Sequence, residues 1–105
     1  MPIHKAERPR RPPTHPGAIL REDVLPALRL NVTQAATDLG VSRQLLHRLI
    51  REKVAITPEM ALKIGRLAGN GPDLWLSLQA AYDLWHAKQK LGAALDAVPE
   101  RHKAA

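Results

Sequence analysis

The sequence contains no cysteine and no phenylalanine, and it has only one tyrosine and two tryptophans. Without cysteine, the chain can form neither a disulfide framework nor a thiolate metal site. With so few aromatic residues, the core must consist mainly of leucine, isoleucine, valine and alanine. No apolar run approaches the roughly 18 residues that span a bilayer, and nothing resembles a signal peptide. We therefore expect one cytoplasmic domain with no membrane partner.

The residues that usually carry catalysis or bind metals are scattered. The acidic residues form no convincing catalytic pair, and Ser42 and Ser77 lack the strand–turn–helix setting of a nucleophile elbow. The glycines at 69–71 indicate a helix stop, because a phosphate loop needs a following Lys-Ser or Lys-Thr and a preceding strand. The sequence therefore predicts no enzyme, no cofactor and no metal. The histidines, which show no zinc-like spacing, are His4, His15, His47, His86 and His102.

Residues 32–51 have the pattern of two short helices joined by a tight turn. Thr33 is predicted to cap the first helix, and Gly40 to supply the left-handed conformation that ends it. Ser42 is predicted to cap the second helix, and Thr57 to cap the later helix that starts with Pro58. Residues 32–51 therefore have the layout of a helix-turn-helix, whose second helix, the recognition helix, can lie in the major groove of DNA. The residues that fall on one shared apolar seam are Ala36, Leu39, Val41, Leu46, Leu49 and Ile50.

Positive charge is concentrated in two parts of the chain, which has a formal net charge of +6. Residues 42–53 and residues 1–15 each hold four basic side chains against one acidic side chain. Charge alone fits either a phosphate-binding face or a solvated helix surface. Because the first cluster coincides with the helix-turn-helix, we favour a phosphate-binding face there. Residues 1–14 are expected to be a disordered basic arm, either a solvated tail or a segment that follows the DNA backbone.

Apolar periodicity predicts an all-α chain with five helices. The first helix should kink or end near Pro26, because proline in a helix interior removes a backbone hydrogen bond and clashes with the preceding turn. Residues 27–32 would then form a connection. Two glycines and an asparagine at 69–71 should break the fourth helix, and Gly92 should weaken the last one. The predicted helices begin at Pro16, cover about 33–39, 42–51 and 58–68, and restart at Pro72.

The last predicted helix is apolar on two faces. One stripe, with Trp75, Leu78, Tyr82 and Trp85, can close the core of its own domain. A helix that is apolar over more than one face needs a second burial partner. In so short a chain we expect that partner to be another subunit, which makes this helix a dimerisation element. The predicted dimerisation residues are Leu74, Ala81, Leu84 and Leu91.

The N-terminal end of a recognition helix meets the base edges of DNA. Arg43 and Gln44 are the candidate base readers, because Arg pairs with guanine and Gln with adenine, each worth roughly 1–3 kcal/mol of discrimination. His47 fits base contact and ordinary exposure equally well. Gln34, in the first turn of the preceding helix, is placed to hold a phosphate with its amide and nearby backbone N–H groups. The remaining predicted DNA contacts are Ser42, Arg48, Arg51 and Lys53.

Five stretches carry a family resemblance: HPGAIL at 15–20, VLPAL at 24–28, LGVSRQ at 39–44, TPEMAL at 57–62 and LWLSLQAAYDLW at 74–85. In this order and spacing they resemble HigA-type antitoxins of the Xre-like helix-turn-helix group. The resemblance implies a five-helix, lambda-repressor-like domain that dimerises and binds a palindromic operator. It also implies neutralisation of a RelE/HigB-like toxin, an mRNA endonuclease, and repression of the shared operon. A cytoplasmic protein that joins the nucleoid when bound to its operator would follow.

Three positions depart from the family pattern. Arg29 and Glu52 stand where the family usually has glycine, before the second helix and after the recognition helix. If the position of Glu52 needs a left-handed backbone, its side chain costs roughly 1 kcal/mol. Leu45 stands where polar residues are common, and it could contact a thymine methyl group or simply lie exposed. By the same resemblance Pro26 is a family feature, so the expected kink becomes a tolerated helix end.

Other functions and boundaries remain open in the sequence. A stand-alone transcription regulator shares every DNA-binding feature, and the charge of +6 favours it, because toxins of this kind are usually basic. A helical protein-interaction module that never touches DNA is a second alternative. A toxin could dock on the last helix, the first helix or the basic arm. We expect a DNA-binding domain over 15–91 and a C-terminal extension over 92–105.

Overall fold

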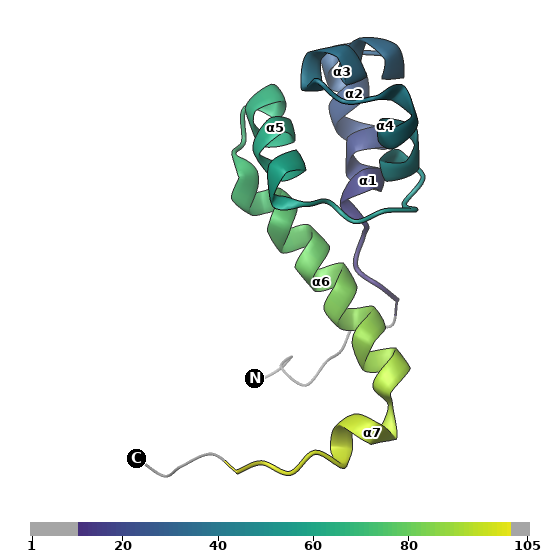
Figure 1. Ribbon diagram of the computed structural model, residues 1–105, viewed down its shortest axis with the longest axis vertical. Coiled ribbons are helices and arrows are strands. Elements are labelled where there is room, and N and C mark those ends of the chain that lie inside the picture. The colour runs from purple at the N-terminus through teal and green to yellow at the C-terminus, as the bar shows by residue number, and fades with distance from the viewer. Residues whose placement is uncertain (1–10, 102–105) are drawn as a thin grey trace, which may run out of the picture.

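Helices dominate residues 11–101, the part of the chain that the computed structural model describes, and no strand occurs there (Figure 1). The all-α prediction is confirmed. Segments α1, η2 and α2 follow one another directly and together form the predicted first helix. Residues 1–10 of the predicted arm lie outside the described part. The elements are α1 Pro16–Ile19, η2 Leu20–Val24, α2 Leu25–Leu28, α3 Val32–Leu39, α4 Arg43–Ile50, α5 Pro58–Ala68, α6 Pro72–Leu91 and α7 Ala93–Asp96.

The first helix passes through Pro26 and ends at Leu28, so it ends near this proline as predicted, but the connection does not begin at residue 27. Helical residues continue to Leu28, and the turn just before the proline is π-helical, with the N–H of Leu25 donating to the carbonyl oxygen of Leu20. This wider turn loosens the regular hydrogen-bond ladder at the point where the proline ring would meet it. The connection to α3 is therefore residues 29–31, shorter than predicted.

Four helices, α2, α3, α4 and α5, end in the same left-handed turn, which Gly69 provides for α5. After α3, Gly40 has φ 70°, and the N–H of Val41 returns to the carbonyl oxygen of Ala36 at 3.0 Å. Helix α2 ends in this way at Arg29, with φ 58°, and α4 at Glu52, with φ 62°. Glu52 therefore occupies the left-handed position that was predicted conditionally for it, and Arg29 occupies another. A side chain there costs roughly 1–2 kcal/mol.

Helix α3 begins earlier than predicted, and Thr33 does not cap it. Asn31 is the cap: its Oδ1 accepts the backbone N–H of Gln34 at 2.8 Å, and Oε1 of Gln34 accepts the N–H of Asn31 at 3.1 Å. This reciprocal pair is a capping box, and its Asn-x-x-Gln spacing was a signal in the sequence. The predicted caps Ser42 and Thr57 are both confirmed.

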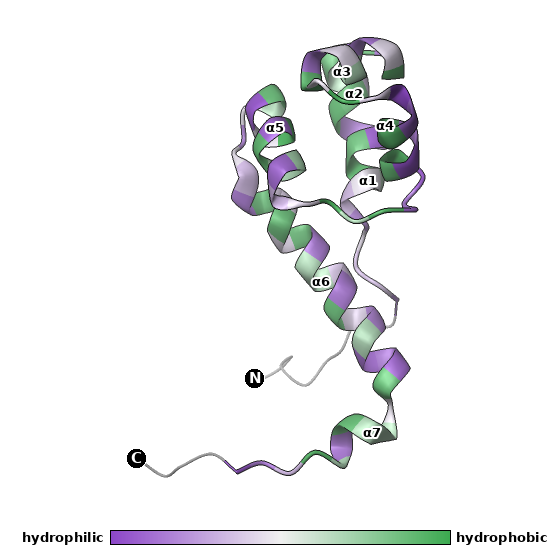
Figure 2. Ribbon diagram, viewed as in Figure 1, coloured by the Kyte–Doolittle hydropathy of each residue, from purple (hydrophilic) through white to green (hydrophobic). Residues whose placement is uncertain are grey.

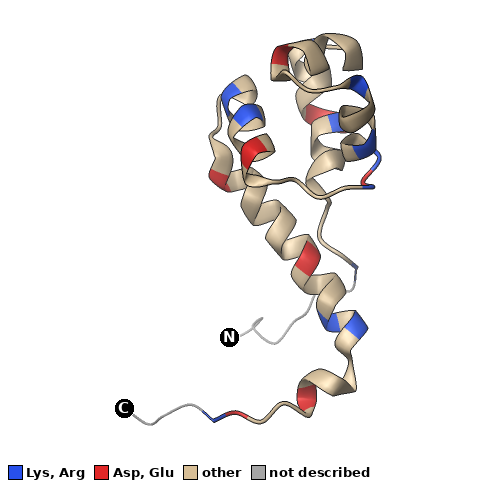
Figure 3. Ribbon diagram, in the orientation of Figure 1, with Lys and Arg blue, Asp and Glu red and all other residues tan. Residues whose placement is uncertain are grey.

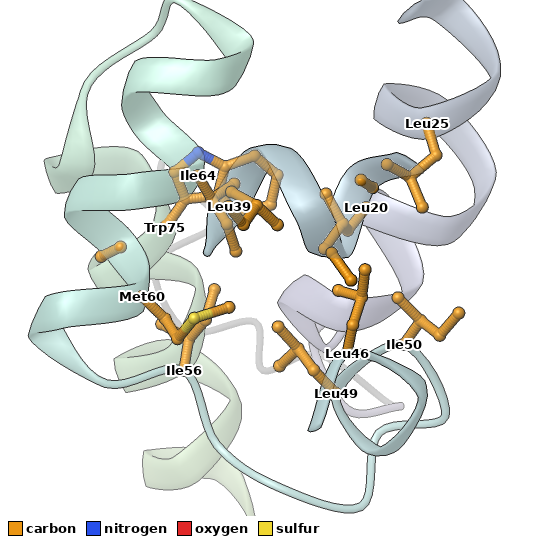
Figure 4. Packing of buried hydrophobic residues seen from close by; sticks show 13 residues of the cluster. Leu20, Leu25, Leu39, Leu46, Leu49, Ile50, Ile56, Met60, Ile64 and Trp75 are labelled. Carbon is orange, nitrogen blue, oxygen red and sulfur yellow. The ribbon is translucent and has the colours of Figure 1, made fainter. Parts of the chain in front are cut away.

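The core lies where the helix-turn-helix meets the first helix and α5 (Figure 4). Leu20, Leu46 and Trp75 are completely or almost completely buried, and the indole N–H of Trp75 donates to Oδ1 of Asn70 at 3.0 Å. Helices α1 and α4 touch so closely that a Cβ atom on Gly17 would overlap the carbonyl oxygen of Leu49. The predicted seam is confirmed, with Val41 half-buried at its edge.

Helix α6 packs on the bundle with its first turns and then projects away from it (Figure 1). Trp75 is buried and Leu78 packs against the core, as predicted. Tyr82 and Trp85 are only half-buried and lie outside the core cluster, so their predicted core role is wrong. Tyr82 still contacts the ring of His15 at the edge of the bundle, and α6 projects away from the bundle beyond this contact. Gly92, with φ 51°, ends α6, where the sequence predicted only a weakened helix. No helix within residues 11–101 is long and apolar enough to cross a bilayer.

Candidate nucleic-acid interface

Helix α4 buries one face and exposes the other. Successive helical residues are about 100° apart, so positions 43, 44, 47, 48 and 51 fall within one arc of about 140°. Basic residues colour this edge of the molecule in Figure 3. The predicted contacts on this face are Arg43, Gln44, His47, Arg48 and Arg51, and Lys53 lies in the loop that follows; all are exposed except His47, which is half-buried.

The start of α4 lies beside the start of α3. Oγ of Ser42 accepts the N–H of Leu45 at 3.0 Å, which leaves the Ser42 hydroxyl hydrogen free to donate. Nη1 of Arg43 donates to Oγ1 of Thr33 at 3.4 Å, so the first turns of the two helices present their polar side chains together. Thr33 therefore contacts a candidate base reader instead of capping a helix. Leu45 is half-buried beside this group.

Gln34 is exposed, but its backbone N–H is not free as the sequence suggested. That N–H and the side-chain Oε1 are both used in the capping box with Asn31. The two Nε2 hydrogens have no partner among residues 11–101 and can only donate. A donor held in this way suits an acceptor such as a phosphate oxygen.

The end of α4 is attached to the first helix by Arg21, which the sequence analysis did not single out. Its Nη1 donates to the carbonyl oxygen of Ile50 at 2.6 Å and lies 3.4 Å from Oε2 of Glu52. Its Nη2 donates to Oε2 of Glu22 at 2.7 Å. The hydrogen bond to Glu22 is the main cause that raises the pKa of Arg21. In the sequence, the one signal of the contact between Arg21 and the end of α4 was Glu52, which stands where the family usually has glycine.

His15 caps the first helix from a buried position. Its Nδ1 accepts the N–H of Gly17 at 2.8 Å, and its ring meets the edge of Tyr82 at a centroid distance of 4.8 Å. Burial lowers the pKa of His15, while Glu52, the Val54 backbone and Asp83 partly oppose that shift. His15 therefore has a structural role. No three His, Cys, Asp or Glu residues between 11 and 101 gather closely enough to hold a metal ion.

The predicted dimerisation stripe is exposed along α6. Leu74, Leu84 and Leu91 are 45%, 61% and 48% exposed, and Ala81 is exposed as well. Leu84 and Ala81 also line a groove of about 670 Å³, together with Trp85 and with Leu95 from α7. Figure 2 shows that apolar residues continue along α6 after it leaves the bundle.

The capped turn between α3 and α4, with its exposed basic second helix, defines a helix-turn-helix DNA-binding protein. No protein-family model matches the chain. Virulence-associated protein I of Dichelobacter nodosus is 40% identical over 78 residues, which are 74% of this chain and 72% of that protein. Antitoxin HigA-1 of Vibrio cholerae is 31% identical over 81 residues, which are 77% of this chain and 76% of that protein.

A solved structure extends the similarity to nearly the whole fold. Antitoxin GraA in complex with its operator matches with a TM-score of 0.81 and 32% identity, covering 93% of this chain and 98% of GraA. The chain therefore belongs to the HigA-type antitoxins of the Xre-like helix-turn-helix family.

Proposed function

We propose that this protein is an antitoxin that binds the operator of its own operon through α4. The exposed N-terminal end of α4, where Arg43 and Gln44 stand beside Thr33, is the observation that carries the proposal. Arg43 and Gln44 would read base edges, and His47 could reach them from the next turn. Gln34, Ser42, Arg48, Arg51 and Lys53 would bind phosphates. The solved complex of the related antitoxin GraA with its operator supports binding to an operator.

The protein would act as a homodimer. Leu74, Ala81, Leu84 and Leu91 form an exposed apolar stripe that its own domain does not cover. Burying that stripe against a second copy removes apolar area from water and places two recognition helices on one duplex. The two would lie about one DNA turn, roughly 34 Å, apart.

The DNA-binding part is tested by binding to the fragment upstream of the gene and to a scrambled fragment. We expect Arg43→Ala and Gln44→Ala each to lose roughly 1–3 kcal/mol of discrimination between the fragments. Arg51→Ala should weaken binding to both fragments equally and lower the salt slope by about one. Lys88→Ala, a basic change on α6 away from this face, is the matched control. Equal affinity of the wild type for both fragments would contradict operator recognition.

The second part of the proposal is neutralisation of a RelE/HigB-like mRNA-endonuclease toxin and repression of the shared operon. Similarity to antitoxin HigA-1 and to antitoxin GraA supports it. The test is co-purification with the product of the neighbouring reading frame, followed by relief of that product's inhibition of translation. A stand-alone regulator is the alternative, and the net charge of +6 favours it because a basic toxin would be repelled at long range. The absence of a neighbouring toxin gene would establish that alternative.

A further inference from the structure

Arg21 links three parts of the molecule with one guanidinium. It lies in the π-helical turn η2 of the first helix. Its side chain donates to the carbonyl oxygen of Ile50, the last residue of α4, and to the carboxylate of Glu52, which ends the turn after α4. Its second terminal nitrogen is held by Glu22 from the same helix turn. The end of the recognition helix is therefore attached to the first helix by a side chain with little freedom to move.

Glu52 occupies a position where glycine would be less strained. Its φ of 62° is left-handed, a conformation that side chains disfavour. Glycine at position 52 would keep both backbone hydrogen bonds of this turn. In the first, the N–H of residue 52 donates to the carbonyl oxygen of Leu49 at 2.9 Å, and in the second the N–H of Lys53 donates to the carbonyl oxygen of Arg48 at 2.9 Å. What glycine would lack is the carboxylate. Within the described part of the chain, that carboxylate bonds to Arg21.

Arg29 provides the matched case in the same molecule. It ends α2 in the same type of turn, with φ 58°, and the N–H of Leu30 returns to Leu25 O at 3.0 Å. Its guanidinium makes no hydrogen bond or ion pair with another residue between 11 and 101. Arg29 and Glu52 therefore have the same backbone strain. Only Glu52 contacts Arg21, the side chain that is hydrogen-bonded to the end of α4.

We propose that Arg21 and Glu52 are positioning residues that hold α4 at one angle to the first helix, so that Arg43 and Gln44 meet the base edges together. The proposal rests on operator binding through α4. Helix α4 has eight residues and is about 12 Å long, so a rotation of about 2.5° around its end displaces the readers at its start by about 0.5 Å. Bidentate contacts tolerate displacements of only about 0.5 Å.

The side-chain hydrogen bonds that join α4 to other helices differ between its two ends, and the shorter one is at the Arg21 end. At the start of α4, Arg43 makes one exposed hydrogen bond of 3.4 Å to Thr33. At the Arg21 end the bond to the Ile50 carbonyl is 2.6 Å long and charge-assisted. The guanidinium also faces the negative end of the helix dipole.

The experiment compares three variants with the wild type in two measurements. The first is denaturant unfolding, and the second is the ratio of dissociation constants for a scrambled fragment and for the upstream fragment. Glu52→Gly should unfold at the same or a higher denaturant concentration, yet its ratio should fall by about threefold or more. Bulk effects of charge largely cancel in that ratio because they change binding to both fragments.

Arg21→Lys keeps the charge, but an ammonium group cannot hold three acceptors in the fork geometry of Arg. Its discrimination ratio should fall by a similar factor. Arg29→Gly is the control: it should also unfold at a higher denaturant concentration while keeping the wild-type ratio. A wild-type ratio in both Glu52→Gly and Arg21→Lys would overturn the proposal.

An equal loss in Arg29→Gly would also overturn the positioning role, since relief of backbone strain would then be the cause. A wild type that binds both fragments equally would overturn the proposed operator recognition, and the positioning role with it. That failure is seen without any variant, so the two failures are distinguishable.

Discussion

The bundle up to Gln79 and the segment after it differ in what holds them in place. In the bundle, left-handed turns or capping side chains close the helix ends, and Leu46 and Trp75 are fully buried. From residue 80 to residue 101 no side chain is buried, although α6 continues to Leu91 (Figure 2). Isolated helical segments of this length are marginal in water. The bundle is thus held by its own contacts, whereas the rest of α6 exposes the apolar stripe that the proposed dimer would cover.

The largest effect expected from this contrast is at Trp75. Trp75→Ala should lower the free energy of unfolding by about 3–5 kcal/mol, because it leaves a large cavity and an unpaired Asn70 carbonyl. Leu84→Ala, on the same helix but 61% exposed, should change it by less than about 0.5 kcal/mol in dilute monomer. Urea unfolding measures both. Similar costs for the two changes would mean that α6 is buried along its whole length in solution.

The next effect concerns the partner surface. Leu84→Glu with Leu91→Glu should weaken self-association by more than about tenfold, because each buried leucine contributes roughly 1.5–3 kcal/mol. Multi-angle light scattering over a dilution series gives the mass, and circular dichroism checks that the helices remain. Lys88→Glu tests whether charge alone has this effect. An unchanged mass in the double variant would remove the stripe as the dimer interface.

A smaller effect is expected inside the bundle, at the left-handed turns. Arg29→Gly should raise the free energy of unfolding by roughly 0.5–1 kcal/mol, since relief of strain exceeds the added entropy of the unfolded chain. Glu52→Gly should raise the free energy of unfolding by less, because it also removes an exposed ion pair with Arg21 that is worth about 0.2–1 kcal/mol. The midpoints of denaturant unfolding compare the two variants, provided that their m-values are equal. A larger gain for Glu52→Gly would show that its ion pair does not stabilise the fold.

The smallest effect is a pH dependence within the bundle. Burial lowers the pKa of His15, so the folded state binds this proton less readily than the unfolded state does. The stabilising contribution of neutral His15 is therefore complete above about pH 6.5 and is lost as the pH falls below it. We expect His15→Asn, which keeps a capping oxygen, to flatten the fall in stability between about pH 7 and 5. Parallel profiles for variant and wild type would contradict this role.

Most helix boundaries were predictable because they depend on neighbouring residues. Gly40, Ser42 and Thr57 act within one turn of the chain, and the structure uses them as expected. The misplaced cap at Thr33 was a local error, since the pattern of Asn31 and Gln34 was available in the sequence. Helix existence, type and approximate length thus follow from local patterns.

The end of the first helix required the folded structure. Pro26 is tolerated because the preceding turn widens, and no residue spacing signals that change. The same limit applies to Tyr82 and Trp85, whose apolar stripe continues after α6 has moved away from the bundle. Periodicity reports which residues share a face but not how far the opposing surface extends.

Local spacing and motif order are enough to identify the helix-turn-helix, its exposed basic face and the family. How α4 is held depends on the packing of distant segments. Arg21 and Glu52 are 31 positions apart, and only the packing of the first helix against α4 brings the guanidinium to the carbonyl oxygen of Ile50. Contacts of this kind depend on distances between helices, which no local pattern encodes.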